Sequence, residues 1–168
     1  TEGYNNLIKL ASLAYTEGLH FRPRIDKELL ARHSAGISCL SGCLGSEVNQ
    51  LFLKGKEKEA AEVAGGLRDL FGKDHFWLEL QRNGISDQDR ANENLIRIAQ
   101  ELGSPLVATN DIHYLRAEDC RAQDVLLCIN TGARRDDENR FRPKPGRIRS
   151  DVPKAGKAKS FLTQAKKL

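Results

Sequence analysis

The amino-acid sequence predicts an α/β fold in which parallel strands are connected by helices. Three observations lead to this class: predicted helices and strands alternate along the chain, the strands are short apolar runs, and turn-forming residues separate them. The chain has 168 residues, enough for one domain with a substantial core. Because the three recognisable strands are too few to close a barrel, we expect an open sheet or further strands upstream of this sequence.

The first forty residues predict two helices and a strand. Apolar residues on one face indicate a helix over residues 4–17, which Gly18 is placed to end. A second, short helix is expected over residues 26–31, with Asp26 as its N-cap residue. Residues 36–40 then form the first predicted strand.

The middle of the chain continues the alternation. Residues 47–53 indicate one or two helical turns, and residues 56–71 form a longer amphipathic helix with Gly72 just past its end. The second predicted strand covers residues 76–80 and leads into a loop at residues 81–84.

The next stretch predicts a helix, a strand and a helix. Ser86 is expected to be the N-cap residue of the clearest helix, with Asp89 three places on, and Gly103 ends that helix. Residues 106–109 form the third strand. A last helix over residues 117–129 has an apolar face that we expect to be buried, made of Ala122, Val125, Leu126 and Ile129.

Charge divides the chain into two parts. Residues 1–130 contain 15 Lys/Arg and 19 Asp/Glu, whereas residues 131–168 contain 12 Lys/Arg and 4 Asp/Glu. We therefore expect a folded part at residues 1–142 and a basic linker or tail of uncertain origin at residues 143–168, disordered except for a short amphipathic helix at its end. Such a tail is either simply solvated or a non-specific nucleic-acid-binding segment.

The cysteines and the apolar content indicate a cytoplasmic protein. The cysteines at positions 39, 43, 120 and 128 are predicted to be reduced and mostly buried thiols, because their neighbours include Ile37, Leu40, Leu44, Leu127 and Ile129. The sequence has no apolar run long enough to cross a bilayer and no signal peptide, so we expect no membrane association. It contains no Met even at its start, so we expect a fragment of a longer protein.

The stretch of residues 106–114 is the candidate functional segment, because it begins as a buried strand and ends in polar side chains. Asp111 and His113 are two residues apart, so in extended backbone both side chains point to the same side and could bind one metal ion. An Asx turn at Asn110 followed by a surface histidine explains the same residues without a metal.

Glu79 is a carboxylate in an otherwise apolar strand. Such a group is costly to bury unless it is paired or near a metal. A salt bridge to Arg82 or Arg90 and a role as a metal ligand are both consistent with its position in the sequence.

Several motifs together resemble the PHP (polymerase and histidinol phosphatase) domain of the alpha subunit of bacterial DNA polymerase III. The resemblance covers roughly residues 3–142. It rests on the order and spacing of the segments at residues 3–10, 23–26, 40–44, 78–81, 107–114 and 124–132.

The resemblance implies a distorted barrel of parallel strands and helices with a metal cluster at the carboxyl ends of the strands, holding zinc, manganese or magnesium. It assigns Asp111 and His113 to the final ligand pair of that cluster and Cys43 to a loop that can present a further ligand. The His-rich ligands from the start of the family's domain are not in this sequence. Many relatives have His where this chain has Asn83, and a neutral amide is a poor transition-metal ligand.

The resemblance also implies a role in DNA replication. The parent subunit carries out DNA-directed DNA synthesis, but the carboxylates of its palm domain are not in this sequence, so no catalytic or cofactor-binding residue is assigned and the fragment itself is expected to be inactive. The PHP segment would be structural, would dock other holoenzyme subunits, notably the proofreading exonuclease, and would keep at most a vestigial 3′–5′ exonuclease site. The alternative is a free-standing PHP-type metal-dependent phosphoesterase.

Overall fold

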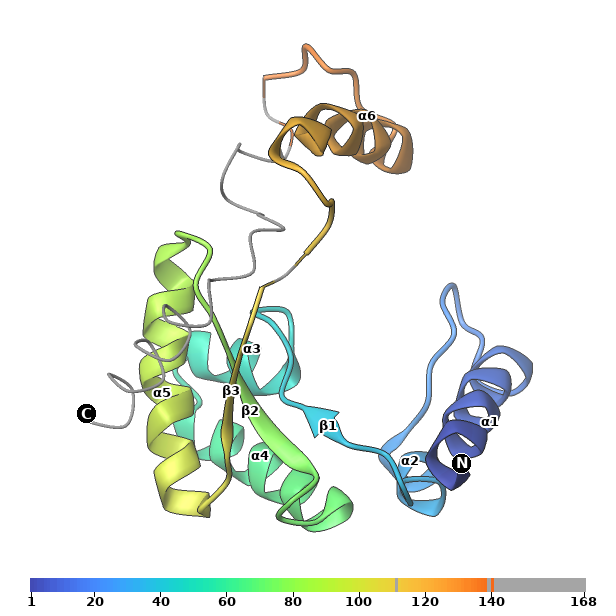
Figure 1. The fold of residues 1–168 in the computed structure, drawn as a ribbon, viewed down its shortest axis with the longest axis vertical. Helices are drawn as coiled ribbons and strands as arrows, with labels where there is room; N and C mark the ends of the chain where they lie inside the picture. Colours follow the sequence, from blue (N-terminus) through green and yellow to red (C-terminus); the bar gives the residue numbers. More distant parts are fainter. Residues whose placement is uncertain (111, 139, 141–168) are drawn as a thin grey trace.

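The structure is a computed structural model that describes residues 1–110, 112–138 and 140 (Figure 1). Its helices are α1 (Glu2–Thr16), α2 (Lys27–Arg32), α3 (Glu47–Leu53), α4 (Glu57–Phe71), α5 (Ser86–Leu102) and α6 (Cys120–Thr131), and the short 3-10 helix η1 (Ala117–Asp119) precedes α6. Its strands are β1 (Cys39–Leu40), β2 (Phe76–Gln81) and β3 (Leu106–Thr109). The basic tail at residues 143–168 and its expected terminal helix lie outside the described residues.

The strands form a parallel sheet in the order β1-β2-β3. Leu78 pairs with Leu106 and Gln81 with Thr109, so the carboxyl ends of β2 and β3 lie side by side. The predicted α/β class with parallel strands is confirmed. The described residues form an open sheet, and the barrel implied by the family resemblance stays a prediction.

Helices α3, α4 and α5 cover one face of the sheet. Alternate side chains of β2 point into this layer, and Phe76, Leu78 and Leu80 are all fully buried there. Helices α4 and α5 both contact β2, and α3 packs against both of them. The core formed in this way is completed by apolar side chains of the three helices: Val48, Ala60, Ala64, Leu95, Ile96, Ile98 and Ala99.

Two of the predicted helix-ending residues are confirmed and one is wrong. Asp26 caps α2 by accepting a hydrogen bond from the backbone N–H of Leu29, at 2.7 Å. Gly103 ends α5 in the left-handed conformation at a φ of 63°. The prediction that Ser86 caps α5 is wrong, because the backbone is still extended at Ile85 and helical from Ser86, and no side chain caps this end.

Helix α1 lies beside the segment that leads into β1. A side chain at Gly3 would lie only 1.9 Å from the carbonyl oxygen of Gly36, so the two backbones touch only because both residues are glycine. Asn6 fixes the contact further by donating a hydrogen bond to the carbonyl of Ala35 at 2.9 Å.

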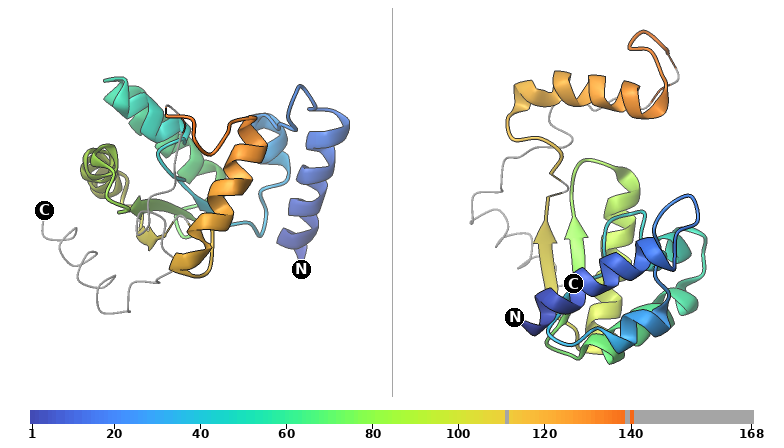
Figure 2. Two further views of the ribbon diagram at one scale, coloured as in Figure 1. Left: turned by 90° about the horizontal axis from the view of Figure 1, so that it is seen from above. Right: turned by 90° about the vertical axis from the view of Figure 1, so that its right-hand side faces the viewer.

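The apolar face of α6 is exposed, which contradicts its predicted burial. Ala122 is exposed, and Val125, Leu126 and Ile129 keep 41%, 53% and 70% of their accessible surface. Figures 1 and 2 show the reason: α6 lies apart from the sheet, and the described residues place no other helix over this face. The apolar periodicity identified the face correctly but could not show whether an element covers it.

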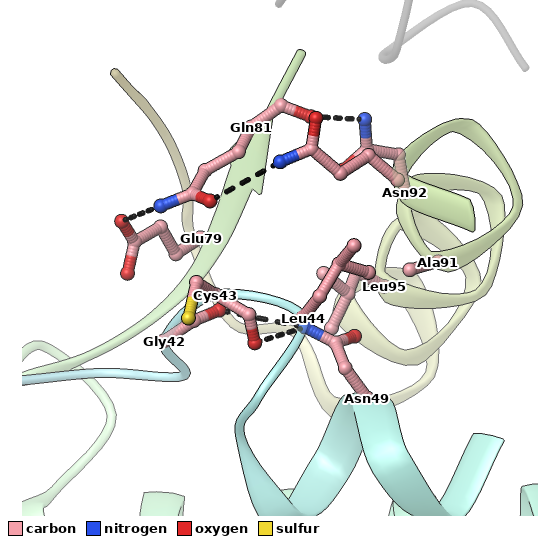
Figure 3. A pocket seen from close by; sticks show the side chains of 10 residues that line it. Gly42, Cys43, Leu44, Asn49, Glu79, Gln81, Ala91, Asn92 and Leu95 are labelled. Carbon is pink, nitrogen blue, oxygen red and sulfur yellow. Dashed lines mark hydrogen bonds between the residues drawn. The ribbon is translucent and has the colours of Figure 1, made fainter. Parts of the chain in front are cut away.

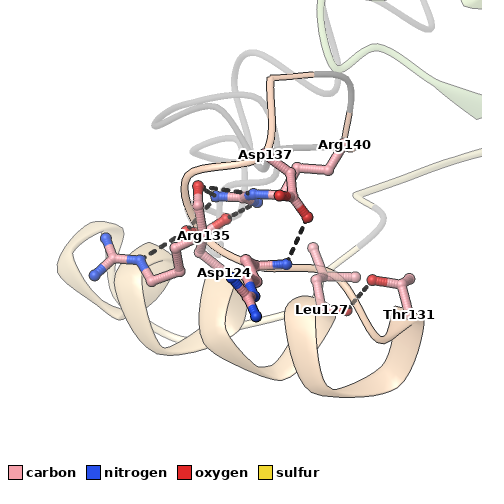
Figure 4. A network of polar contacts seen from close by, with 7 residues as sticks. Asp124, Leu127, Thr131, Arg135, Asp137 and Arg140 are labelled. Carbon is pink, nitrogen blue, oxygen red and sulfur yellow. Dashed lines mark hydrogen bonds and ion pairs between the residues drawn. The ribbon is translucent and has the colours of Figure 1, made fainter.

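The segment after α6 folds back onto that helix. Arg140 donates two hydrogen bonds to the carboxylate of Asp124, at 2.5 and 2.9 Å, and Arg135 donates a third at 3.4 Å (Figure 4). The side chains of Asp124 and Arg140 are only 13% and 8% exposed. This clasp holds residues 132–138 against α6.

The four cysteines are free thiols. Cys120 and Cys128 are buried, Cys39 is half-buried and Cys43 is exposed, which matches the prediction of reduced and mostly buried cysteines except at Cys43. In the described part of the chain, no helix combines the length and the apolar character needed to cross a membrane.

Candidate functional site

Polar side chains meet where the three parallel strands end. The hydroxyl of Ser41, just after β1, accepts a hydrogen bond from the backbone N–H of Glu79 at 2.9 Å. The carboxylate of Glu79 accepts hydrogen bonds from the hydroxyl of Thr109 and from the amide of Gln81, the latter at 3.1 Å. The parallel register places these groups together, because strand ends at one edge of a sheet bring their last side chains close.

Helix α5 contributes two buried amides to this cluster. Asn92 donates to the backbone carbonyl of Gln81 at 2.9 Å, and Gln88 donates to its side-chain oxygen at 3.4 Å (Figure 3). Gln88 also accepts a hydrogen bond from the backbone N–H of Asn83 at 2.7 Å. Since Gln81, Gln88 and Asn92 are each no more than 6% exposed, these bonds tie β2, the following loop and α5 into one rigid unit.

A small cavity lies beneath this network. Its volume is about 10 Å³, which is room for roughly one water molecule. Asn49 from α3 reaches into it and donates to the carbonyl of Cys43 at 3.0 Å, while its own side-chain oxygen has no hydrogen-bond partner in the described residues. The cavity lining is completed by Gly42, Leu44, Glu79, Gln81, Gln88, Ala91, Asn92 and Leu95.

Of the two alternatives for Glu79, the salt bridge to an arginine does not form. Arg82 pairs with Asp89 at 3.2 Å and Arg90 with Asp87 at 3.7 Å, and no ion pair joins Glu79 to either arginine. Glu79 is instead stabilised by hydroxyl and amide donors, which suit a half-buried carboxylate. One carboxylate among neutral amides can orient a water molecule or a polar ligand, but it does not form a nucleophile and base pair.

The predicted metal ligands are only partly placed by the structure. Cys43 is exposed in the loop after β1, and His113 is exposed beyond the end of β3. Asp111 lies outside the described residues. Among the residues that are described, no three His, Cys, Asp or Glu side chains form a group that could hold a metal ion, so these residues do not by themselves fit a metal cluster. The ligand set Asp111, His113 and Cys43 stays a prediction.

The amide network was not predicted from the sequence. Gln88 and Asn92 are four residues apart, and they lie on the same helical stripe as Leu95 and Ala99. Continuing that apolar stripe towards the start of the helix places both amides on the buried face. Amide side chains on the buried face of a predicted helix were therefore the feature of the sequence that could have indicated this network.

Comparison with known proteins shows which family and which proteins this chain is similar to. Residues 1–83 match the PHP domain family. DNA polymerase III subunit alpha of Borreliella burgdorferi is 48% identical over 140 residues, which is 83% of this chain. The same subunit of Treponema pallidum is 47% identical over 142 residues, or 84% of the chain, and that of Deinococcus radiodurans is 49% identical over 141 residues, also 84%.

The match covers only part of those proteins. This chain spans 12% of the Borreliella and Treponema subunits and 10% of the Deinococcus subunit. The chain is therefore homologous to the PHP region of bacterial DNA polymerase III alpha subunits.

Proposed function

We propose that this chain serves as the PHP segment of the alpha subunit of a bacterial replicative DNA polymerase III, a DNA-directed DNA polymerase. The observation that carries the proposal is an identity of 47–49% with alpha subunits over more than four-fifths of the chain. Synthesis of DNA would belong to the parent subunit. The segment described here would act as a structural and docking element, with other holoenzyme subunits, above all the proofreading exonuclease, as its partners.

The surface of the molecule supports a docking role. Helix α6 presents Leu126 and Ile129 to solvent, and α1 presents Tyr4 and Leu7 at 63% and 55% exposure. Helical faces of this kind are typical of protein-interaction sites, because burying large apolar side chains contributes most to the free energy of binding.

A chimeric alpha subunit tests the proposal. Residues 3–142 would replace the matching segment of the Borreliella burgdorferi alpha subunit, and primer extension and binding of that organism's proofreading subunit would be measured. We expect both to be retained, while deletion of the segment should abolish soluble, active protein. A folded chimera that neither extends primers nor binds any holoenzyme subunit would contradict the proposal.

We further propose that metal binding by this segment is weak and involves Asp111, His113 and Cys43. The two-residue spacing of Asp111 and His113 and the exposure of Cys43 support it, whereas Asn83 offers only a neutral amide. Fewer than four strong ligands cannot close a tetrahedral zinc site. Calorimetric zinc titration should therefore show modest affinity that falls further in His113→Ala, and identical isotherms would exclude His113.

The alternative of a free-standing phosphoesterase requires a complete metal cluster, because clustered metals activate the attacking water in that chemistry. The described residues supply no such cluster, and the relatives named above are polymerase subunits. Hydrolysis of p-nitrophenyl phosphate in the presence of zinc, manganese or magnesium distinguishes the two functions. We expect none above background.

A further inference from the structure

A groove with an acidic rim runs across helices α2, α3 and α4, on a part of the molecule that the proposed site does not use. Its volume is about 540 Å³. The floor is apolar and is formed by Leu51, Val63, Leu67 and Leu70. The rim carries three carboxylates and one ammonium group, from Glu47, Glu59, Glu62 and Lys27.

Gly66 creates the hollow in the floor. A side chain at this position of α4 would have no atom within 4 Å of its Cβ, so the space above it is open. A glycine inside a helix costs about 1 kcal/mol relative to alanine. No positive φ requires glycine at Gly66, and its lack of a side chain leaves this part of the groove open.

Two of the three rim carboxylates form ion pairs within the described part of the chain, and the third does not. Lys27 pairs with Glu47 at 3.2 Å and Lys56 with Glu59 at 2.9 Å, but both pairs are largely exposed to solvent. Glu62 has no ion-pair partner in the described part of the chain. An apolar floor with a negative rim fits a cationic amphipathic helix, which would place its apolar face on the floor and its cations at the rim.

The chain contains such a segment at its own end. In residues 157–168, the apolar side chains are spaced so that one helical face would carry Phe161, Leu162, Ala165 and Leu168, and the cations are Lys157, Lys159, Lys166 and Lys167. We propose that this C-terminal segment docks in the groove of α2, α3 and α4. The charge division along the chain favours it, because residues 1–130 are acidic overall and residues 131–168 strongly basic.

The connection between Arg140 and this segment is long. Sixteen residues separate Arg140 from Lys157, and an extended chain of that length spans about 50 Å. Docking within one chain is also favoured by the high effective concentration of a tethered segment.

Zero-length carbodiimide cross-linking of the full chain, followed by mass spectrometry, tests this docking. The reagent joins a lysine amine directly to a carboxylate, so we expect links from Lys166 or Lys167 to Glu59 or Glu62. The neighbouring pair Lys27 and Glu47 provides an internal control for reactivity in every sample. An equal mixture of ¹⁵N-labelled and unlabelled chains shows whether links form within one chain.

Two matched variants test whether the cross-links depend on the open groove. Gly66→Phe should lower the yield of these links at least about fivefold, since the ring fills the space a docked helix would occupy. Gly66→Ala gives α4 a similar gain in helix propensity but leaves the groove open, so it should cross-link like the wild type. The double variant Phe161→Ser with Leu162→Ser should lose these cross-links, while the rest of the protein stays folded as in the wild type.

Three results would overturn the proposal. These are an absence of links from Lys166 and Lys167 to the rim, an unchanged yield in Gly66→Phe, and links formed mainly between labelled and unlabelled chains. The last would mean that a second copy supplies the helix.

Discussion

Asp124 lies in a cationic environment made by its own chain. The hydrogen bond from Arg140 lowers the pKa of the Asp124 carboxyl below its ordinary value; desolvation opposes this, and the charges of Arg140 and Arg135 add to it. In the unfolded chain the carboxyl titrates near its ordinary pKa of about 4. The clasp therefore contributes fully above about pH 5 and is lost as the pH falls through the lowered pKa of the folded state.

Arg140→Gln tests the clasp directly. Removing the guanidinium should raise the pKa of Asp124 towards its ordinary value, because the strongest lowering interaction is gone. Carboxyl ¹³C NMR titration of the wild type and the variant measures this shift. Arg97→Gln is the control, since Arg97 pairs with Glu57 at 2.6 Å in another part of the molecule. Equal Asp124 titrations in all three proteins would show that the clasp does not form in solution.

The cysteines should differ in reactivity. Burial raises the pKa of the Cys39 thiol, which lowers its thiolate fraction, whereas Cys43 is exposed. Iodoacetamide at pH 7.5 should modify Cys43 first, roughly tenfold faster than Cys39, because the thiolate is the reacting species and needs access to the reagent. A mass-spectrometric time course gives the order, with labelling in urea as the control. Equal rates in the native protein would contradict the described packing of β1.

At the scale of elements, α5 connects the core with the polar cluster. Its middle buries Leu95 and Ile98 against β2, while its first two turns direct Gln88 and Asn92 to Gln81. One helix therefore fixes both the packing of the sheet and the position of its carboxyl edge.

Asn92→Ala should destabilise the protein by about 1–3 kcal/mol, because it leaves the buried carbonyl of Gln81 without this donor. Urea unfolding followed by circular dichroism measures the change in the free energy of unfolding. Glu93→Ala, at the adjacent exposed position, is the matched control and should change stability by less than about 0.5 kcal/mol. If both variants unfold at the same urea concentration, the amide network does not stabilise α5.

The helices and strands could be predicted from the sequence better than the burial of their side chains. The second and third strands and the helix ended by Gly103 follow from apolar periodicity and turn residues, which act locally, whereas the strand predicted over residues 36–40 is only Cys39–Leu40. The exposure of Leu126 could not be predicted in this way, because burial depends on which element packs over a face.

The candidate site was also only partly predictable from local sequence patterns. Glu79 was recognised as an unusual carboxylate, but its partners Thr109 and Gln81 depend on strand register, which no local pattern specifies. The buried Gln88 and Asn92 lie on the continuation of the apolar stripe of α5, but the stripe does not specify their partners. Their burial is stable because tertiary hydrogen bonds pair both amides.

At the scale of the whole molecule, charge and apolar surface are distributed unevenly. Trp77 lies on the half-exposed face of the sheet, opposite the helices, and α1 and α6 carry further exposed apolar side chains. The acidic groove of α2, α3 and α4 lies on the same chain as a strongly basic tail. Electrostatic attraction within the chain therefore competes with attraction of the tail to any external polyanion.

DNA binding by the full chain should be carried by the tail, non-specific and steeply dependent on salt. Residues 131–168 hold 12 Lys/Arg against 4 Asp/Glu, and binding would come from release of counterions at phosphates. With about four phosphate contacts, raising salt from about 50 to 200 mM should weaken binding roughly 100-fold. Fluorescence anisotropy with a short labelled duplex measures this for the full chain and for a truncation after Gly132 whose helical signal is checked by circular dichroism. A folded truncation that binds as tightly would place the DNA site on the sheet and its helices instead.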